Sequence, residues 1–109
     1  LAGRLHHVAF AVDAREHVLR AAAVFLDEAV TLEAGPAKHA VQQTFFLYVF
    51  EPGGNRIEVI SDGRLILSPD WPPVTWTLEE RSRGQAWRTA MPESWFTYAT
   101  PPPDSKPTI

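Results

Sequence analysis

Two side chains in the first half of the sequence have the types and the setting expected of metal ligands. His7 and Glu58 each lie in a stretch with the alternation of a β-strand. A carboxylate that faces inward needs a positive partner, because burying it unpaired is costly. Arg56, on the same predicted strand face, is one candidate partner for Glu58. A divalent cation such as iron(II), manganese or zinc, shared with His7, is the other. The pattern by itself leaves both open.

The other histidines and one tyrosine give weaker signals. His39 follows a Gly-Pro pair and is expected on a loop, where it reads as a solvated surface residue. Tyr48 lies in the middle of a predicted strand, where a core tyrosine bonds its hydroxyl to a backbone group. His6 is expected to point away from His7, because neighbours in a strand face opposite sides. His17 falls on the opening turn of a predicted helix. Their positions alone do not require a chemical role.

The elements that must hold these side chains follow the order strand, helix, strand, strand, strand. Strands are predicted at residues 5–12, 32–34, 44–50 and 56–61, with a break after the second at Gly35-Pro36 and a tight turn at 52–55. The helix should be capped by Asp13, with Glu16 at capping-box spacing, and should end near residue 29. Its apolar stripe is Val18, Ala22, Phe25, Leu26 and Ala29. These patterns predict an α+β fold built on one βαβββ module.

The first strand should have two unlike faces. Val8, Phe10 and Val12 make one face bulky and apolar, so it should pack against the helix. Ala9 and Ala11 make the face of His7 small. Small side chains beside a polar one leave room for something other than protein.

The chain divides into three parts by composition and residue pattern. Residues 1–62 form the module. From residue 63 onward the chain holds most of the prolines and all four tryptophans, and residues 63–100 should wrap over the module with the tryptophans as packing anchors. Short helices are predicted at 78–87, capped by Thr77, and near 92–98. Residues 101–109 read as a disordered, proline-rich tail.

Composition excludes several classes of function. With 109 residues and a formal charge of -3, the chain has no basic cluster for nucleic acid or an anionic membrane surface. It has no cysteine, which removes thiolate ligands and nucleophiles and fits a reducing cytoplasm. No apolar stretch approaches the roughly 20 residues of a membrane span. A start at Leu1 suggests a piece excised from a longer protein.

Five phrases of the sequence form an ordered set: LHHVAF (5–10), GPAKH (35–39), YVFEPGGNRIEV (48–59), PPVTWT (72–77) and SWFT (94–97). In this order they resemble the last module of type I extradiol ring-cleavage dioxygenases, most closely the catechol 2,3-dioxygenase branch. These enzymes belong to the vicinal oxygen chelate superfamily, also called the glyoxalase/bleomycin resistance superfamily. The resemblance implies half of a vicinal oxygen chelate barrel and a role in aromatic catabolism.

The resemblance also implies a role for each matching residue. His7 and Glu58 match two metal ligands, and His39 and Tyr48 match groups that bond the bound catecholate and steady the oxygen intermediates. The implied cofactor is Fe(II), with Mn(II) also suited to these ligands. The implied substrates are a catechol-type diol and dioxygen.

The sequence departs from the family in what it lacks. In the family, the first histidine ligand and the principal acid–base histidine lie on the preceding module, so the isolated chain is expected to have an incomplete active site. Half a curved sheet would also expose apolar surface, which soluble monomers rarely tolerate. We therefore expect the chain to pair with its missing module or with a second copy.

Two other functions compete with the dioxygenase. A dimer that combined His7 and Glu58 of both chains would resemble the metal site of a glyoxalase-like isomerase or lyase. A non-catalytic binding protein of the superfamily would hold a small ligand without metal. His39 and Tyr48 disfavour the isomerase or lyase, and the pair of His7 and Glu58 disfavours the binding protein.

Overall fold

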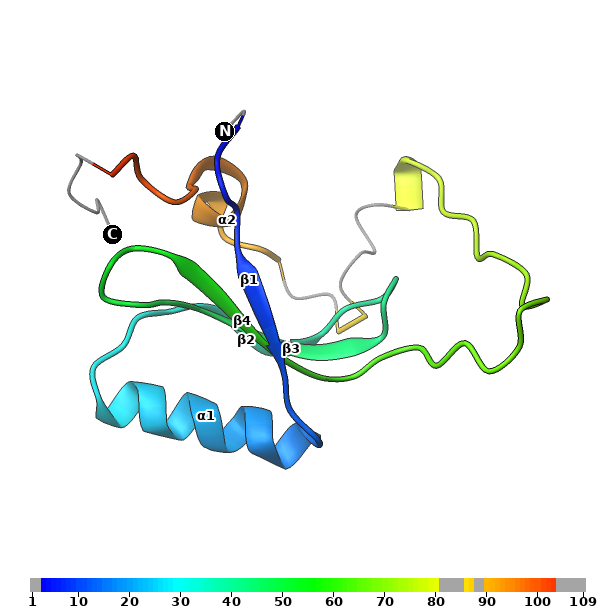
Figure 1. Ribbon diagram of the computed structural model, residues 1–109, viewed down its shortest axis with the longest axis horizontal. Coiled ribbons are helices and arrows are strands. Elements are labelled where there is room, and N and C mark those ends of the chain that lie inside the picture. Colours follow the sequence, from blue (N-terminus) through cyan, green and yellow to red (C-terminus); the bar gives the residue numbers. More distant parts are fainter. Residues whose placement is uncertain (1–2, 81–85, 88–89, 104–109) are drawn as a thin grey trace.

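The computed structural model describes residues 3–80, 86–87 and 90–103, which form a four-stranded sheet and two helices (Figure 1). The strands lie in the order β1-β4-β3-β2, in which β1 runs parallel to β4 and the other neighbours are antiparallel. This architecture confirms the predicted α+β fold and the βαβββ order. The elements are β1 (Val8–Ala11), α1 (Arg15–Asp27), β2 (Leu32–Lys38), β3 (Thr44–Phe50), β4 (Arg56–Asp62) and α2 (Glu93–Thr97).

Helix α1 covers one face of the sheet and forms the main core with it (Figure 1). Val18 of α1 is fully buried, and it packs in one cluster with Leu47 of β3 and Val59 of β4. Burying an aliphatic side chain of this kind contributes about 1.5–3 kcal/mol, so this layer fixes which way each strand faces. The alternate side chains point to the opposite side, here called the open face and defined by Ala37, Phe46, Tyr48 and Glu58.

The packing of β1 differs from the prediction. Val8 and Phe10 pair in register with Ile57 and Val59, yet their exposed fractions are 40% and 56%. The reason is that β1 is the edge strand, while α1 packs against β2, β3 and β4. Of the three bulky residues, Val12 is the one that packs against the α1 core. The prediction that this whole face packs against the helix is therefore wrong.

Helix α1 starts and ends differently from its predicted caps. Its N-cap is Ala14, which makes no side-chain capping bond, so the predicted cap at Asp13 is wrong by one residue. At the other end Ala29 has a left-handed φ of 58°, and the backbone N–H of Val30 donates to the carbonyl of Phe25. This is a Schellman ending, which confirms the predicted end near residue 29.

Strand β2 continues through the predicted break. It runs to Lys38 across a cis Gly35–Pro36 bond, with irregular register to β3 between Ala34 and Ala37. Gly35 has a φ of 84°, and a Cβ added there would lie 2.6 Å from the carbonyl oxygen of Phe46. Glycine thus allows the two strands to approach, and the break predicted from the sequence is a strand irregularity.

The turn between β3 and β4 is organised by one carboxylate. Glu51 accepts hydrogen bonds from the backbone N–H of Gly53 (2.8 Å) and from the backbone and side-chain N–H groups of Asn55 (2.7 and 2.6 Å). The backbone N–H groups of Asn55 and Gly53 lower the pKa of Glu51 below its ordinary value. The turn fixes where β4 begins and hence where Glu58 lies.

The Glu51→Gln substitution should destabilise the chain by about 1 kcal/mol near neutral pH, because hydrogen bonds to a charged acceptor are stronger than those to an amide. A carboxyl with a lowered folded-state pKa stabilises above its unfolded pKa, and this contribution is lost as pH falls through the folded value. The free energy of unfolding, measured with urea, should therefore differ less between wild type and variant as pH drops below about 4.5. An unchanged difference at low pH would contradict this, and Glu28→Gln, at an exposed position, is the control.

The C-terminal region has two unlike stretches. Residues 91–99 lie against the open face, where Met91 and Trp95 pack, and α2 confirms the predicted second helix. The 64–78 arm extends away from the sheet (Figure 1), and its side chains Leu65 to Leu67 are at least 75% exposed. Thr77 makes the predicted capping contact, in which its hydroxyl accepts from the backbone N–H of Glu80, and the Glu80 carboxylate in turn accepts from the backbone N–H of Thr77. Residues 81–85 of the predicted helix and the 104–109 part of the predicted tail lie outside the described residues. No helix in the described part is long and apolar enough to cross a membrane.

Candidate metal centre

The structure brings His7, His39, Tyr48 and Glu58 together on the open face. Glu58 lies in the middle of β4 directly opposite Tyr48 of β3. His7 immediately precedes β1, whose Ala9 pairs with Glu58. His39 follows β2, and its backbone N–H donates to the carbonyl of Thr44 on the return into β3. All four strands therefore contribute to this point, each supplying one of the predicted residues from within the strand or from a position next to its end.

His7 and Glu58 face one another across a short gap. The His7 Nε2 and Glu58 Oε2 atoms are 3.7 Å apart, and the Glu58 side chain is 9% exposed against 31% for His7. Burial, with smaller contributions from the charges of His6 and Arg56, lowers the pKa of His7 below 6.5. The imidazole is therefore neutral at neutral pH, which is the form that binds a metal ion.

Arg56, the alternative partner for Glu58, is directed elsewhere. An arginine has five N–H donors, and here all five bond to other groups. Two go to the carboxylate of Glu33, at 2.6 and 2.8 Å. The other three go to backbone carbonyls of His6, Ser94 and Tyr98, at 2.9–3.0 Å. The buried charge of Arg56 is thus matched by Glu33, and the simpler explanation for a buried Glu58 is removed.

Tyr48 and His39 extend the site beyond the pair formed by His7 and Glu58. The ring of Tyr48 lies edge-on to His7 with centroids 5.4 Å apart, and its hydroxyl is 3.4 Å from His39 Nε2. Burial, reinforced by the Glu58 carboxylate, raises the pKa of Tyr48 far above its ordinary value, so the hydroxyl stays protonated. His39 is buried and stacks on Phe46 at 3.8 Å, which corrects the expectation of a solvated loop residue.

His6, to which the sequence pattern gave no role, belongs to the site. Its Nδ1 lies 2.7 Å from His7 Nδ1, and its Nε2 lies 2.6 Å from the carbonyl oxygen of Trp95. The prediction that it points away from His7 is wrong, because regular alternation begins only at Val8. The adjacent pair His6-His7 is the sequence feature that could have indicated a role for His6, whereas nothing in the sequence indicated that Trp95 is its partner.

A divalent cation fits the donors that are present. An imidazole nitrogen and a carboxylate oxygen 3.7 Å apart can be spanned by two bonds of roughly 2 Å, the length usual for such ions. A cation would also compensate the buried charge of Glu58, which Arg56 does not. Among the described residues, no third His, Cys, Asp or Glu joins this pair to form a complete metal-binding group.

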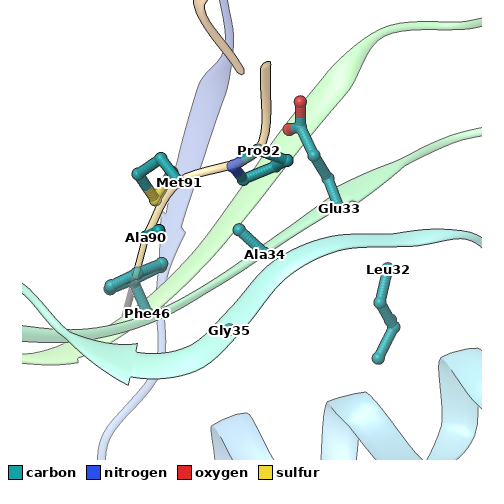
Figure 2. A pocket seen from close by; sticks show the side chains of 8 residues that line it. All are labelled: Leu32, Glu33, Ala34, Gly35, Phe46, Ala90, Met91 and Pro92. Atoms are coloured by element: carbon teal, nitrogen blue, oxygen red, sulfur yellow. The ribbon is translucent and has the colours of Figure 1, made fainter. Parts of the chain in front are cut away.

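A pocket of about 400 Å³ opens between the sheet and the segment that precedes α2 (Figure 2), and Phe46 links it to the site. Phe46 forms part of its wall and also carries the stacked ring of His39. Its volume lies within the range of small-molecule sites. The lining residues are Leu32, Glu33, Ala34, Gly35, Phe46, Ala90, Met91 and Pro92.

Comparison with known families places this geometry in context. Residues 2–59 match the model of the Glyoxalase/Bleomycin resistance protein/Dioxygenase superfamily, which is more than half of the chain. The chain belongs to this superfamily. The matched region contains the whole βαβββ core except the last residues of β4, and both His7 and Glu58. The superfamily implied by the sequence phrases is thereby confirmed.

Individual superfamily members resemble the chain over most of its length. Metapyrocatechase of Geobacillus stearothermophilus is 40% identical over 102 residues, or 91% of this chain. Manganese-dependent 2,3-dihydroxybiphenyl 1,2-dioxygenase of Geobacillus genomosp. 3 is 44% identical over 77% of the chain. The substrate complex of homoprotocatechuate 2,3-dioxygenase from Brevibacterium fuscum superposes with a TM-score of 0.74, at 31% identity over 89% of the chain. The chain spans 31%, 27% and 31% of the lengths of these three relatives.

Proposed function

We propose that the chain forms part of the active site of an extradiol dioxygenase that opens catechol-type rings with dioxygen. The observation that carries this proposal is the buried Glu58 carboxylate facing a neutral His7, with Arg56 committed to Glu33. His7 and Glu58 would be two of three protein ligands, the third coming from outside this chain. The similarity to metapyrocatechase supports the reaction class.

The metal is proposed as iron(II), with manganese(II) as the alternative. Two histidines and a carboxylate on one face of an ion suit either metal, and one relative is named as manganese-dependent. When bound, the ion would hold the diol and dioxygen together and pass electron density between them. The ring would open beside the diol, and both oxygen atoms would enter the product.

The residues beside the ligands have roles that follow from their protonation and packing. Tyr48, kept neutral by burial and by Glu58, donates a hydrogen bond toward the diol oxygens. His39, within 3.4 Å of the Tyr48 hydroxyl, accepts or returns a proton at the same place. Phe46 holds the His39 ring by stacking and offers an apolar wall to the aromatic substrate. The three together orient the substrate ring and exclude water from one side of it.

A chimera tests the proposal directly. The chain would replace the matching segment of Geobacillus stearothermophilus metapyrocatechase, be loaded anaerobically with iron(II) or manganese(II), and be given catechol in air. We expect a yellow ring-cleavage product from the chimera and none from the 109-residue chain or from the truncated relative. A folded, metal-loaded chimera without product would overturn the proposal. Tight stoichiometric zinc or nickel in the isolated chain would instead favour the glyoxalase-like dimer.

The partner of the module is proposed to be a second module, either its missing neighbour or another copy. The exposed edge strand β1, with Val8 and Phe10, and the apolar 64–78 arm support this. Surfaces of this kind are rare on soluble monomers. Sedimentation of the isolated chain at micromolar concentration should show dimers or larger species, and Phe10→Lys should shift the distribution toward monomer. A purely monomeric wild-type chain would contradict the prediction.

A further inference from the structure

We propose that His6 is a positioning residue that fixes the tautomer of His7, so that the His7 Nε2 lone pair faces Glu58. This inference rests on the proposed metal-binding role of His7. It concerns the metal-free protein, in which hydrogen bonds alone determine where each ring proton lies.

The chain of bonds starts at a group that can only accept. The backbone carbonyl oxygen of Trp95 lies 2.6 Å from His6 Nε2. A carbonyl has no proton to give, so the proton in this contact is on His6 Nε2. A neutral imidazole carries one ring proton, and His6 Nδ1 is therefore an acceptor.

The second hydrogen bond determines which ring nitrogen of His7 carries the proton. His6 Nδ1 and His7 Nδ1 are 2.7 Å apart, so one of them must donate and the other accept. Since His6 Nδ1 accepts, the proton lies on His7 Nδ1. The neutral His7 ring then has an unprotonated Nε2, which is the atom 3.7 Å from Glu58 Oε2.

The arrangement excludes a simpler use of His7. If His7 carried its proton on Nε2, it could donate directly to the carboxylate and form an ordinary neutral–anion hydrogen bond. With the proton on Nδ1, two lone pairs face each other across the gap, and a cation is the species that both would attract. His6 thus keeps the pair available for a metal ion.

The position of His6 is itself held by the C-terminal segment. Its ring contacts Trp95 edge-on with centroids 4.8 Å apart, and Arg56 donates to its backbone carbonyl at 3.0 Å. Arg56 also donates to the carbonyl of Ser94, next to Trp95. One buried arginine therefore anchors both ends of the bond that sets the tautomer.

Nitrogen-detected NMR of the four histidine rings in the metal-free 109-residue chain tests the inference. The spectrum is recorded near about pH 8.5, some two units above the ordinary histidine pKa. We expect His6 to be protonated at Nε2 and His7 at Nδ1, the form that free histidine disfavours. A His7 ring protonated at Nε2 in the wild-type chain would overturn the proposal, whatever the variants show.

Variants then test whether His6 is the group that determines the His7 tautomer. In His6→Phe the His7 Nε2 resonance should move toward the protonated range, and in His6→Asn, whose amide oxygen can accept from His7 Nδ1, it should stay near the wild-type position. His17→Phe, on the exposed side of α1, is the matched control and should leave His7 unchanged. Retention of the Nδ1–H form in a folded His6→Phe chain would show that another group sets it. Because no metal is added, this failure is separate from failure of the dioxygenase proposal, which the chimera measures.

Discussion

Ring cleavage by the chimera should fall by more than about 100-fold when Glu58 is replaced by glutamine. Changes to groups that only support a metal ligand typically cost 10–100-fold in metal affinity or activity, so loss of a ligand should cost more. The amide keeps the size of the side chain but cannot supply a negative oxygen to the ion. Product formation and bound metal per protein are the two measurements, and both should drop together.

Controls separate a ligand from a structural residue. Glu28→Gln changes the same chemical group at an exposed position and should leave activity unchanged. In the metal-free chain, Glu58→Gln should lower the free energy of unfolding by no more than about 1 kcal/mol, since it removes a buried charge while keeping the volume. His7→Ala provides a second test of the site. If either substitution left metal binding and cleavage normal, the ligand assignment would be wrong.

The largest loss of stability is expected at Arg56. The Arg56 and Glu33 side chains are 0% and 1% exposed, and removing one partner of a buried ion pair typically costs 3–5 kcal/mol. Arg56→Met should therefore lower the free energy of unfolding by about 3–5 kcal/mol, a large share of what a small domain has. Urea unfolding followed by tryptophan fluorescence measures this loss.

Two comparisons make the Arg56 prediction specific. Arg56→Met with Glu33→Leu should recover part of the loss, because no unmatched buried carboxylate remains. Arg15 pairs with Asp62 at 2.5 Å, but both side chains are well exposed, at 42% and 38%. Arg15→Met should therefore cost about 1 kcal/mol or less. Equal losses at Arg15 and Arg56 would show that burial does not decide the strength of these pairs.

Local pattern was enough to predict most elements of the module. The aromatic and β-branched residues of 44–50 predicted β3 with its bounds, and the turn residues at 52–55 predicted where β4 begins. Alternation in β4 also placed Arg56 and Glu58 on one face, and in the structure the next residue, Val59, faces the α1 core instead. These features are local, because the period of a strand and the chemistry of a turn depend on neighbouring residues only.

Predictions failed where distant segments decide the outcome. Whether Val8 and Phe10 are buried depends on how far α1 reaches across the sheet, and β1 lies at the edge beyond it. Whether Gly35-Pro36 ends β2 depends on β3, which keeps pairing on both sides of it. One further difference is local, since α1 begins after Ala14 and not after the predicted cap Asp13.

By itself the sequence determined the βαβββ order, the strand faces that bring His7 and Glu58 together, and the phrases that indicate the superfamily. Only the tertiary structure decided what surrounds these two residues. Arg56 could have paired with Glu58 on the same strand face, but Glu33 and three carbonyls from distant segments take all its donors. His6 acquires a role only because α2 brings the Trp95 carbonyl to it from 89 residues away. Such contacts depend on which segments meet in space, and a strand's two-residue period carries no information about that.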